Sequence, residues 1–359
     1  MTIAASESIV GWGPQSAKGT LATTWYRHKA LDVNLGTQQA VQYFPQEVGG
    51  GFHLTGAFKG FAFGGGTVAL APRLEDVIGW LAYAGCGQLS DIADTPESGI
   101  NRHRFMPPDS YHDMKWVSLR KFIPGATGTS DDLGEIIKDV RVGSQQYKVG
   151  PASIVMAEYG FVGREPFLDE TADSSAWTWA NSYETYESVP LGNKGGLYLP
   201  FGSTAKKATQ AVVTIADKYT TPQEELIIGS YYPDDYILQQ QTFSVQWVFK
   251  WKDETLYNQI VTNGGSGDVD GYITWSPVVY TSSFELVTES PANISGFSSP
   301  YRLRFYAPEM TWQSQGPPRA VGGGWLALPF VGTALGQSTV SDTFFLDIDN
   351  EVSTYSWPS

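Results

Sequence analysis

The side chains that could perform catalysis or bind a metal are few and widely spaced. The chain has one cysteine, Cys86, and four histidines, His28, His53, His103 and His112. No pair of histidines has the spacing of a metalloprotease or other helical metal-binding motif. His103, His112 and Asp113 could meet around a metal, but residues 101–113 are polar. We therefore expect these histidines at the surface and predict no metal site.

Nucleophile and phosphate-binding motifs are also missing from the sequence. Cys86 lies among glycines after a predicted helix, and we expect it to be a small packed side chain rather than a nucleophile. No nucleophile elbow, P-loop or dinucleotide-binding glycine pattern occurs. Residues 265–271 carry two aspartates on a glycine-rich loop without the spacing of a calcium loop, and this favours a hairpin turn. We predict a protein that is not an enzyme and has no cofactor.

Glycine triplets and tryptophans are the other conspicuous residues. The triplets are residues 49–51, 64–66 and 322–324. They lie in or beside predicted strands without accompanying cations, so we interpret them as sites of bending and close backbone approach. The 12 tryptophans could form sugar-stacking platforms. However, Trp247 and Trp251 share the apolar face of a predicted strand and Trp80 lies in a predicted helix, which favours core or subunit-interface positions.

The elements that position these residues are mostly strands. Residues 243–251 alternate strictly between apolar and polar side chains, which predicts a strand with one buried face. Residues 301–305 alternate similarly, whereas residues 154–162 and 325–331 are apolar enough for covered strands. Pro329 would place the last of these at a sheet edge or bulge, because proline donates no ladder hydrogen bond.

Two segments have the periodicity of helices. Residues 72–85 carry an apolar stripe, acidic residues in the first turn and Gly85 at the end. Residues 253–264 carry a second stripe between Asp253, the expected cap, and Gly264, the expected stop.

The two helices belong to a pattern that occurs twice. Each follows a strand, and each strand follows an extended segment and a loop. In the first half these segments are residues 39–45, 46–59 and 61–71, and in the second they are residues 225–233, 234–240 and 243–251. The helix ends lie 179 residues apart and two Phe-Val-Gly triplets, residues 161–163 and 330–332, lie 169 apart. We therefore predict two copies of one strand–loop–strand–helix–strands module, divided within residues 165–193.

Composition and charge limit the class of protein. The chain has 359 residues, 42% of them hydrophobic and 14% aromatic, which excludes a disordered chain. Its net charge is -14, of which residues 1–168 contribute -2 and residues 169–359 contribute -12. This balance argues against a protein that grips nucleic-acid phosphates. A single cysteine excludes an internal disulfide framework. With no signal-peptide pattern and no long apolar run, we expect cytoplasmic synthesis and no membrane anchor.

The order of several short motifs resembles that of the major tail tube proteins of long-tailed bacteriophages. Residues 11–20 are similar to the family's GxGxExxxGT opening, with Gln15 at the position that is usually acidic. A glycine-rich loop, a strand and a helix ending near Gly87 then follow in the family's order. Residues 138–163 and 310–330 also resemble segments of that family.

The resemblance implies a mainly β fold and a structural role in the virion. It implies two tandem tail-tube modules, each a β-sandwich or half-barrel flanked by one α-helix, with extended loops and terminal arms. We place an N-terminal arm at residues 1–25 and the modules at residues 26–168 and 169–359. Such a chain would self-assemble in the host cytoplasm into homotrimeric, pseudo-hexameric rings. The rings would stack into the tail tube through which the genome is ejected.

The resemblance also implies site residues and partners. The family's ring-stacking loop lies between two strands, as residues 46–59 do here, with residues 234–240 as the counterpart. The predicted ring-stacking residues are Gly49, Gly50, Gly51, Phe52, His53, Lys59, Asp234, Asp235 and Tyr236. Residues 6–24 and the tail after Asp342 are expected to reach neighbouring rings. The implied partners are further copies of the chain, the tape measure, initiator and terminator proteins of the tail, and DNA as a non-specific cargo.

The charge fits this role, because an acidic lumen has no fixed cations to hold the phosphates of passing DNA. The alternative interpretation is a carbohydrate-binding or adhesive β-sandwich protein.

Overall fold

A computed structural model describes residues 8–44, 56–92, 96–125, 132–169, 177–198, 208–250, 257, 260–261, 279–321, 325–336 and 343–358. Their main element is a large antiparallel sheet, so the prediction of a mainly β protein is confirmed. The strands are β1 (Ile9–Pro14), β2 (Tyr26–His28), β3 (Ala30–Tyr43), β4 (Ala57–Leu70), β5 (Gln88–Ile92), β6 (Asn101–Met106), β7 (Val117–Ile123), β8 (Leu133–Val149), β9 (Met156–Asp169), β10 (Leu197–Tyr198), β11 (Ala208–Tyr219), β12 (Leu238–Lys250), β13 (Thr281–Asn293), β14 (Pro300–Ser314), β15 (Arg319–Val321), β16 (Trp325–Ala334) and β17 (Phe345–Asn350). The helical elements are α1 (Val77–Cys86) and the 3-10 turns η2 (Tyr111–Asp113) and η5 (Tyr186–Ser188).

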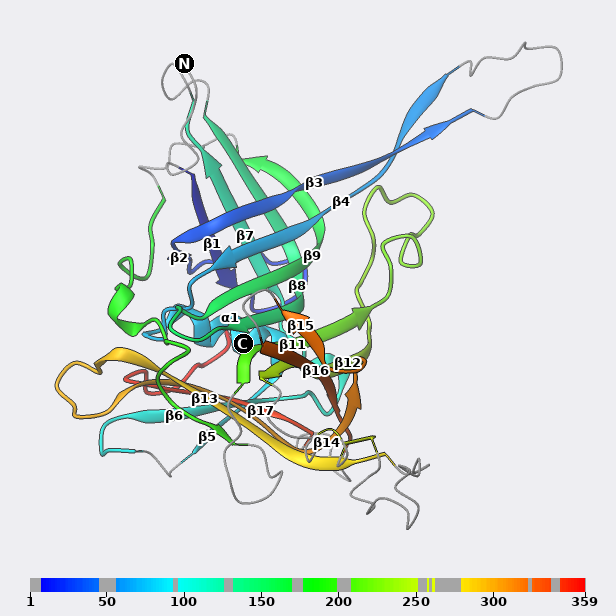
Figure 1. Cartoon of the computed structure of the whole chain (residues 1–359). Helices are drawn as coiled ribbons and strands as arrows, with labels where there is room; N and C mark the ends of the chain where they lie inside the picture. The colour runs from blue at the N-terminus through cyan, green and yellow to red at the C-terminus, as the bar shows by residue number, and fades with distance from the viewer. Residues whose placement is uncertain are drawn as a thin grey trace.

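The strands of the first half pair in the order β3–β4–β9–β8–β7, and β1 and β2 extend this group beyond β7. Those of the second half pair in the order β11–β12–β16–β14–β13. Each order begins with two strands that are consecutive in the sequence, β3–β4 or β11–β12. The next strand, β9 or β16, comes from late in that half, and the last two strands, β8–β7 or β14–β13, come before it in the sequence. Figure 1 shows the β3–β4 hairpin projecting well beyond the other strands.

The two groups of strands form one sheet rather than two separate ones. The C-terminal part of β8 leaves β7 and pairs with β11, from Ser144 opposite Ala216 to Val149 opposite Ala211. At another place β17, near the C-terminus, lies between β14 and β6. Strands of the first half therefore pair with strands of the second half at two places, β8 with β11 and β6 with β17.

One hydrophobic core extends through both halves. Tyr147 of β8 and Phe305 of β14 are fully buried, and their ring centroids lie 4.9 Å apart. The predicted alternation of residues 243–251 is confirmed within β12, where Phe243, Val245 and Trp247 are all buried. Burying such a side chain contributes roughly 1.5–3 kcal/mol, so this face of β12 strongly fixes the register of the strand.

Two sequence-based expectations about strands differ from the structure, one of them only in part. Residues 225–233, expected to be extended, form turns, and β11 occupies the position before β12 instead. The strand with Pro329 is not at an edge, because β16 pairs with β12 and also with β14 and β15. Pro329 lies opposite the break between β14 and β15, where its carbonyl accepts the Gln315 N–H, so its missing donor interrupts no ladder on that side.

The predicted first helix is present with shifted ends. It begins at Val77 rather than residue 72 and ends at Cys86, where Gly87 adopts a φ of 95°. The helix packs between β8 and β6 and is buried on nearly all sides, not only along the predicted stripe. Of the predicted second helix, Tyr257, Ile260 and Val261 are helical, and its other residues lie outside the described part of the chain.

Residues 8–24 and 343–358, near the two ends of the chain, pack onto the molecule. Strand β1 pairs with β7 and β2, and Trp12 is buried. Residues 351–358 cross α1, where Tyr355 is buried against Gly79 and Trp80. Residues 8–24 and 343–358 therefore contribute to the sheet and its core, and their contact with neighbouring rings stays a prediction.

Glycines 64–66 have the structural role predicted for them. Gly65 and Gly66 have φ values of 156° and 134°. A Cβ on Gly66 would overlap the carbonyl oxygen of Asn34, and one on Gly64 would overlap Ile137. The triplet therefore lets β4 pass very close to β3 and β8.

Candidate functional site

The titratable residues form no metal-binding group among the residues described. His103, expected at the surface, is fully buried in β6, and its ring nitrogens contact Asp91 (2.7 Å) and the Val352 carbonyl (2.8 Å). That expectation was wrong because His103 lies on the inward face of β6, where Val352 and Tyr355 pack against its ring. Within these parts of the chain, no three histidine, cysteine, aspartate or glutamate residues are placed to hold a metal.

Cys86 is a packed side chain, as predicted. It is fully buried, and the Gln145 amide donates to its sulfur at 3.7 Å. Burial raises the pKa of the Cys86 thiol, and the nearby Asp217 raises it further. A thiol in this environment remains protonated and is a poor nucleophile.

The opening motif, residues 11–20, is tied to β8 by a buried polar network around Asp139. The Asp139 carboxylate accepts hydrogen bonds from Gly19 N (2.7 Å), the Gln15 amide (3.2 Å) and Arg164 (2.9 Å). Asp139 itself has a φ of 55°, and its N–H donates to the Gln15 side chain. A glutamate at position 15 would face this carboxylate, so the neutral amide of Gln15 suits the network.

The predicted ring-stacking residues have different environments. Gly49, Gly50, Gly51, Phe52 and His53 lie outside the described residues. Lys59 is exposed and belongs to β4 rather than to a loop.

The second-half residues of that set pack against the first half. Asp234 and Asp235 each lie 3.5 Å from the Lys18 ammonium. Tyr236 is buried, and its hydroxyl donates to the Gly163 carbonyl (3.2 Å). Together with Arg164, whose guanidinium donates to Pro233 O at 2.6 Å, these contacts fix one end of the segment between β11 and β12.

Exposed apolar side chains gather near the outer part of the β3–β4 hairpin and on residues 227–231. The hairpin carries Tyr43, Phe44 and Phe58, exposed by 60%, 52% and 46%. Ile228 and Tyr231 lie on the segment between β11 and β12, which meets the hairpin where Tyr231 O accepts from Ala62 N (2.8 Å). Neighbouring patches of this kind are typical of a protein-binding surface.

Strands β2, β3, β5, β10 and β15 each pair with a single neighbour within the described residues. Strand β3 pairs only with β4, although Lys121 donates to Leu35 O at 2.6 Å and Thr37 contacts Glu135 through its side chain. Strand β15 pairs only with β16. Unpaired edges present donors and acceptors to another strand, and soluble proteins usually protect them.

A second polar feature is a ladder of ion pairs across β6, β17, β14 and β13. Its members are Arg102, Arg104, Asp347, Asp349, Arg302, Arg304, Glu285 and Glu289. Arg104 binds the buried Asp347 through two hydrogen bonds of 2.9 Å, and Arg304 bridges Asp347 and Glu285. The ladder is electrically balanced, so it joins strands without offering charge to a ligand.

A further polar cluster joins residues 177–198 to α1. Glu184 accepts the N–H groups of Asp76 and Val77, both at 2.8 Å, and its other oxygen lies 3.8 Å from His28. Burial raises the pKa of Glu184 to about 8. Burial, with Arg73 alongside, lowers the pKa of His28 to about 3. Both groups are therefore neutral near pH 7, which suits a structural link.

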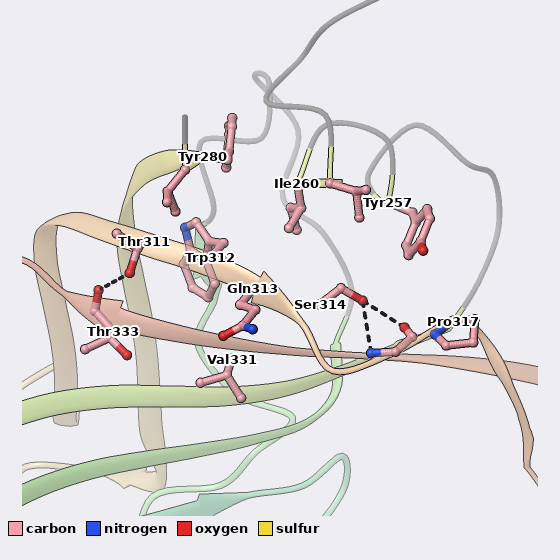
Figure 2. A pocket seen from close by; sticks show the side chains of 13 residues that line it. Tyr257, Ile260, Tyr280, Thr311, Trp312, Gln313, Ser314, Pro317, Val331 and Thr333 are labelled. Carbon is pink, nitrogen blue, oxygen red and sulfur yellow. Dashed lines mark hydrogen bonds between the residues drawn. The ribbon is translucent and has the colours of Figure 1, made fainter. Parts of the chain in front are cut away.

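A pocket of about 660 Å³ lies beside β14 and β16. Figure 2 shows the side chains that line it. Tyr257, Ile260, Tyr280 and Trp312 form its apolar walls, and Gln313 contributes a polar group. None of the lining residues carries a charge. The pocket can accept an apolar side chain.

Strand β11 and the cap that Glu184 provides for α1 were not predicted from the sequence. Strand β11 has a short alternation in which Ala211, Val213 and Ile215 are buried, and this pattern could have revealed it. The cap had no local signal, because Glu184 lies more than one hundred residues from the helix it caps.

No protein-family model matches the chain, and comparison with curated proteins finds no significant relative. No helix in the described parts of the chain has the length and apolar character needed to span a membrane.

Proposed function

We propose that the chain is a structural virion protein, the subunit of a phage tail tube. The observation that carries this proposal is the repeated strand order, β3–β4–β9–β8–β7 and β11–β12–β16–β14–β13. We infer from it two tandem copies of one module, each with a helix after its hairpin. The β8–β11 pairing then continues one sheet from module to module, as the wall of a ring requires.

The exposed apolar surface supports axial contacts between rings. The β3–β4 hairpin and the segment before β12 are the corresponding connections of the two modules, and they meet at Ala62 and Tyr231. Figure 1 shows the hairpin reaching far beyond the sheet. Side chains such as Tyr43, Phe44 and Ile228 would be buried when one ring docks on another. We infer three copies per ring, six modules in all, and DNA as a non-specific cargo.

The carbohydrate-binding alternative has less support. Trp12, Trp25, Trp177, Trp247 and Trp312 are buried. None of the tryptophans whose burial is described is exposed, whereas sugar stacking needs an open aromatic face.

Negative-stain microscopy of the purified protein tests the proposal. Rings or long tubes, with trimers or their multiples by light scattering, are the expected result. A monomer at every concentration and salt, without tubes even in the presence of tail initiators, would refute it. Binding to a glycan panel that is lost on replacement of one tryptophan would favour the alternative.

A further inference from the structure

The pairing between β8 and β11 joins the two halves of the chain. Each half also has a strand edge that corresponds to one side of this pairing but pairs with no strand in the described residues. Val213 of β11 lies opposite Tyr147 of β8 in this antiparallel pairing. Both side chains are fully buried. The contact thus combines main-chain hydrogen bonds with the burial of apolar side chains. The first half contributes the edge of β8 and the second half contributes the edge of β11.

The first-half counterpart of the β11 edge is the unpaired edge of β3. The two Phe-Val-Gly triplets align Gly163 of β9 with Gly332 of β16. Gly163 lies opposite Gly64, which lies opposite Thr37 of β3. In the second half, Gly332 lies opposite Val245, which lies opposite Val213 of β11. Thr37 therefore occupies the position of Val213.

The second-half counterpart of the β8 edge is the unpaired edge of β15. Tyr147 of β8 lies opposite Ala157 of β9. The same alignment of the triplets places Ala157 at the position of Leu326 in β16, and Leu326 lies opposite Ala320 of β15. Ala320 therefore occupies the position of Tyr147.

We propose that β3 of one copy pairs antiparallel with β15 of a second copy, with Thr37 opposite Ala320 of the second copy. This inference rests on the proposed tube function and names the surfaces that form the lateral contact. It repeats between chains the pairing that Val213 and Tyr147 make within one chain. Because the two edges differ, the contact is head-to-tail and generates a closed ring when the rotation per copy is suitable.

The free edges have the properties expected of such a contact. Strand β3 is 14 residues long, and most of its side chains are exposed, including Thr37 and Leu31. Arg319 and Ala320 of β15 are exposed as well. Pro317 and Pro318 precede β15 and offer no N–H, which limits uncontrolled strand addition on this side before assembly.

Cysteine cross-linking tests the assigned register. Residues opposite each other in antiparallel strands have Cα atoms about 4.5–5.5 Å apart, within reach of a disulfide. The double variant Thr37→Cys with Ala320→Cys is oxidised and run on a non-reducing gel, and the natural Cys86 is buried and remains silent. The matched control is Asp32→Cys with Ala320→Cys, because Asp32 is an exposed residue on the same strand, five positions away.

We expect the Thr37–Ala320 variant to lose its monomer band in favour of a ladder that ends at a covalent trimer, while the control keeps its monomer band. Each sample is also imaged and its mass measured by light scattering. Rings or tubes without this ladder, or with an equal ladder in the control, would overturn the edge assignment and leave the proposed function standing. A strictly monomeric protein would overturn both.

Discussion

The buried carboxyl of Glu184 should make the free energy of unfolding depend on pH. Its side chain is 5% exposed, and burial raises its pKa from the ordinary 4.5 to about 8. Below pH 4.5 the folded and unfolded chains both carry this proton. Between about pH 4.5 and 8 the unfolded chain releases the proton while the folded chain keeps it, so stability falls as pH rises. The full shift corresponds to about 5 kcal/mol at about 1.4 kcal/mol per pKa unit.

Replacement of Glu184 by glutamine removes this titration and keeps an oxygen that can accept the N–H groups of Asp76 and Val77. His28, whose pKa is lowered to about 3, acts in the opposite sense, because its stabilisation is lost as pH falls from 6.5. The informative quantity is therefore the difference in unfolding free energy between the wild type and Glu184→Gln, measured by urea denaturation at a series of pH values.

We expect this difference to move in favour of Glu184→Gln by roughly 1.4 kcal/mol per pH unit from pH 5 to 8 and to level off above that. The control is Glu187→Gln, which alters an exposed carboxylate on the same segment and should run parallel to the wild type. Parallel curves for Glu184→Gln and the wild type would refute the view that Glu184 is protonated in the folded protein.

Two further expectations concern packing. Gly66→Ala should destabilise the fold by about 3 kcal/mol or more, because its Cβ would overlap the Asn34 carbonyl. The control is Gly36→Ala, in an open position on the neighbouring strand, which should change the melting temperature little. An equal effect of the two replacements in thermal unfolding would contradict this account. Cys86 should react with a thiol reagent only on unfolding, because burial raises its pKa and covers the sulfur; rapid labelling of the native protein would show that the region around α1 opens.

The parts of the fold that could be predicted from the sequence are those with a strong local pattern. The alternation in residues 243–251 and the apolar stripe of residues 72–85 correspond to β12 and α1. The ends of α1 were less accurate, because its N-terminal N–H groups are capped by Glu184 from a remote segment. In the same way, Gly85 precedes the true end because Gly87 adopts the positive φ.

Contacts between distant segments could not be predicted in this way. The polar segment that contains His103 looked like a surface segment, yet β17 and residues 351–358 cover it. Tyr236 was assigned to a contact loop from its position between strands, but its hydroxyl reaches Gly163, 73 residues away. The functions of Gly49–Gly51, Phe52 and His53 in ring stacking remain predictions.

The difference in net charge between the two halves of the sequence does not correspond to two separate regions of the fold. Residues 1–168 carry a net charge of -2 and residues 169–359 carry -12. In the fold, Arg102 and Arg104 of the first half are paired with Asp349 and Asp347 of the second. The negative charge of the second half is therefore not confined to a separate region of the fold. Strand β17 places second-half aspartates beside the arginines of β6 in the same sheet.

The field inside a ring would depend on the acids that remain unpaired and on the face of the sheet that lines the lumen. The ladder acids are matched by four arginines, so they would add little to that field wherever they face. In the proposed tube, the acidic excess that DNA would meet would come from other carboxylates. In the proposed ring, lateral pairing of β3 with β15 would decide which of these carboxylates become neighbours, so the register found by cross-linking would also constrain the charge of the lumen.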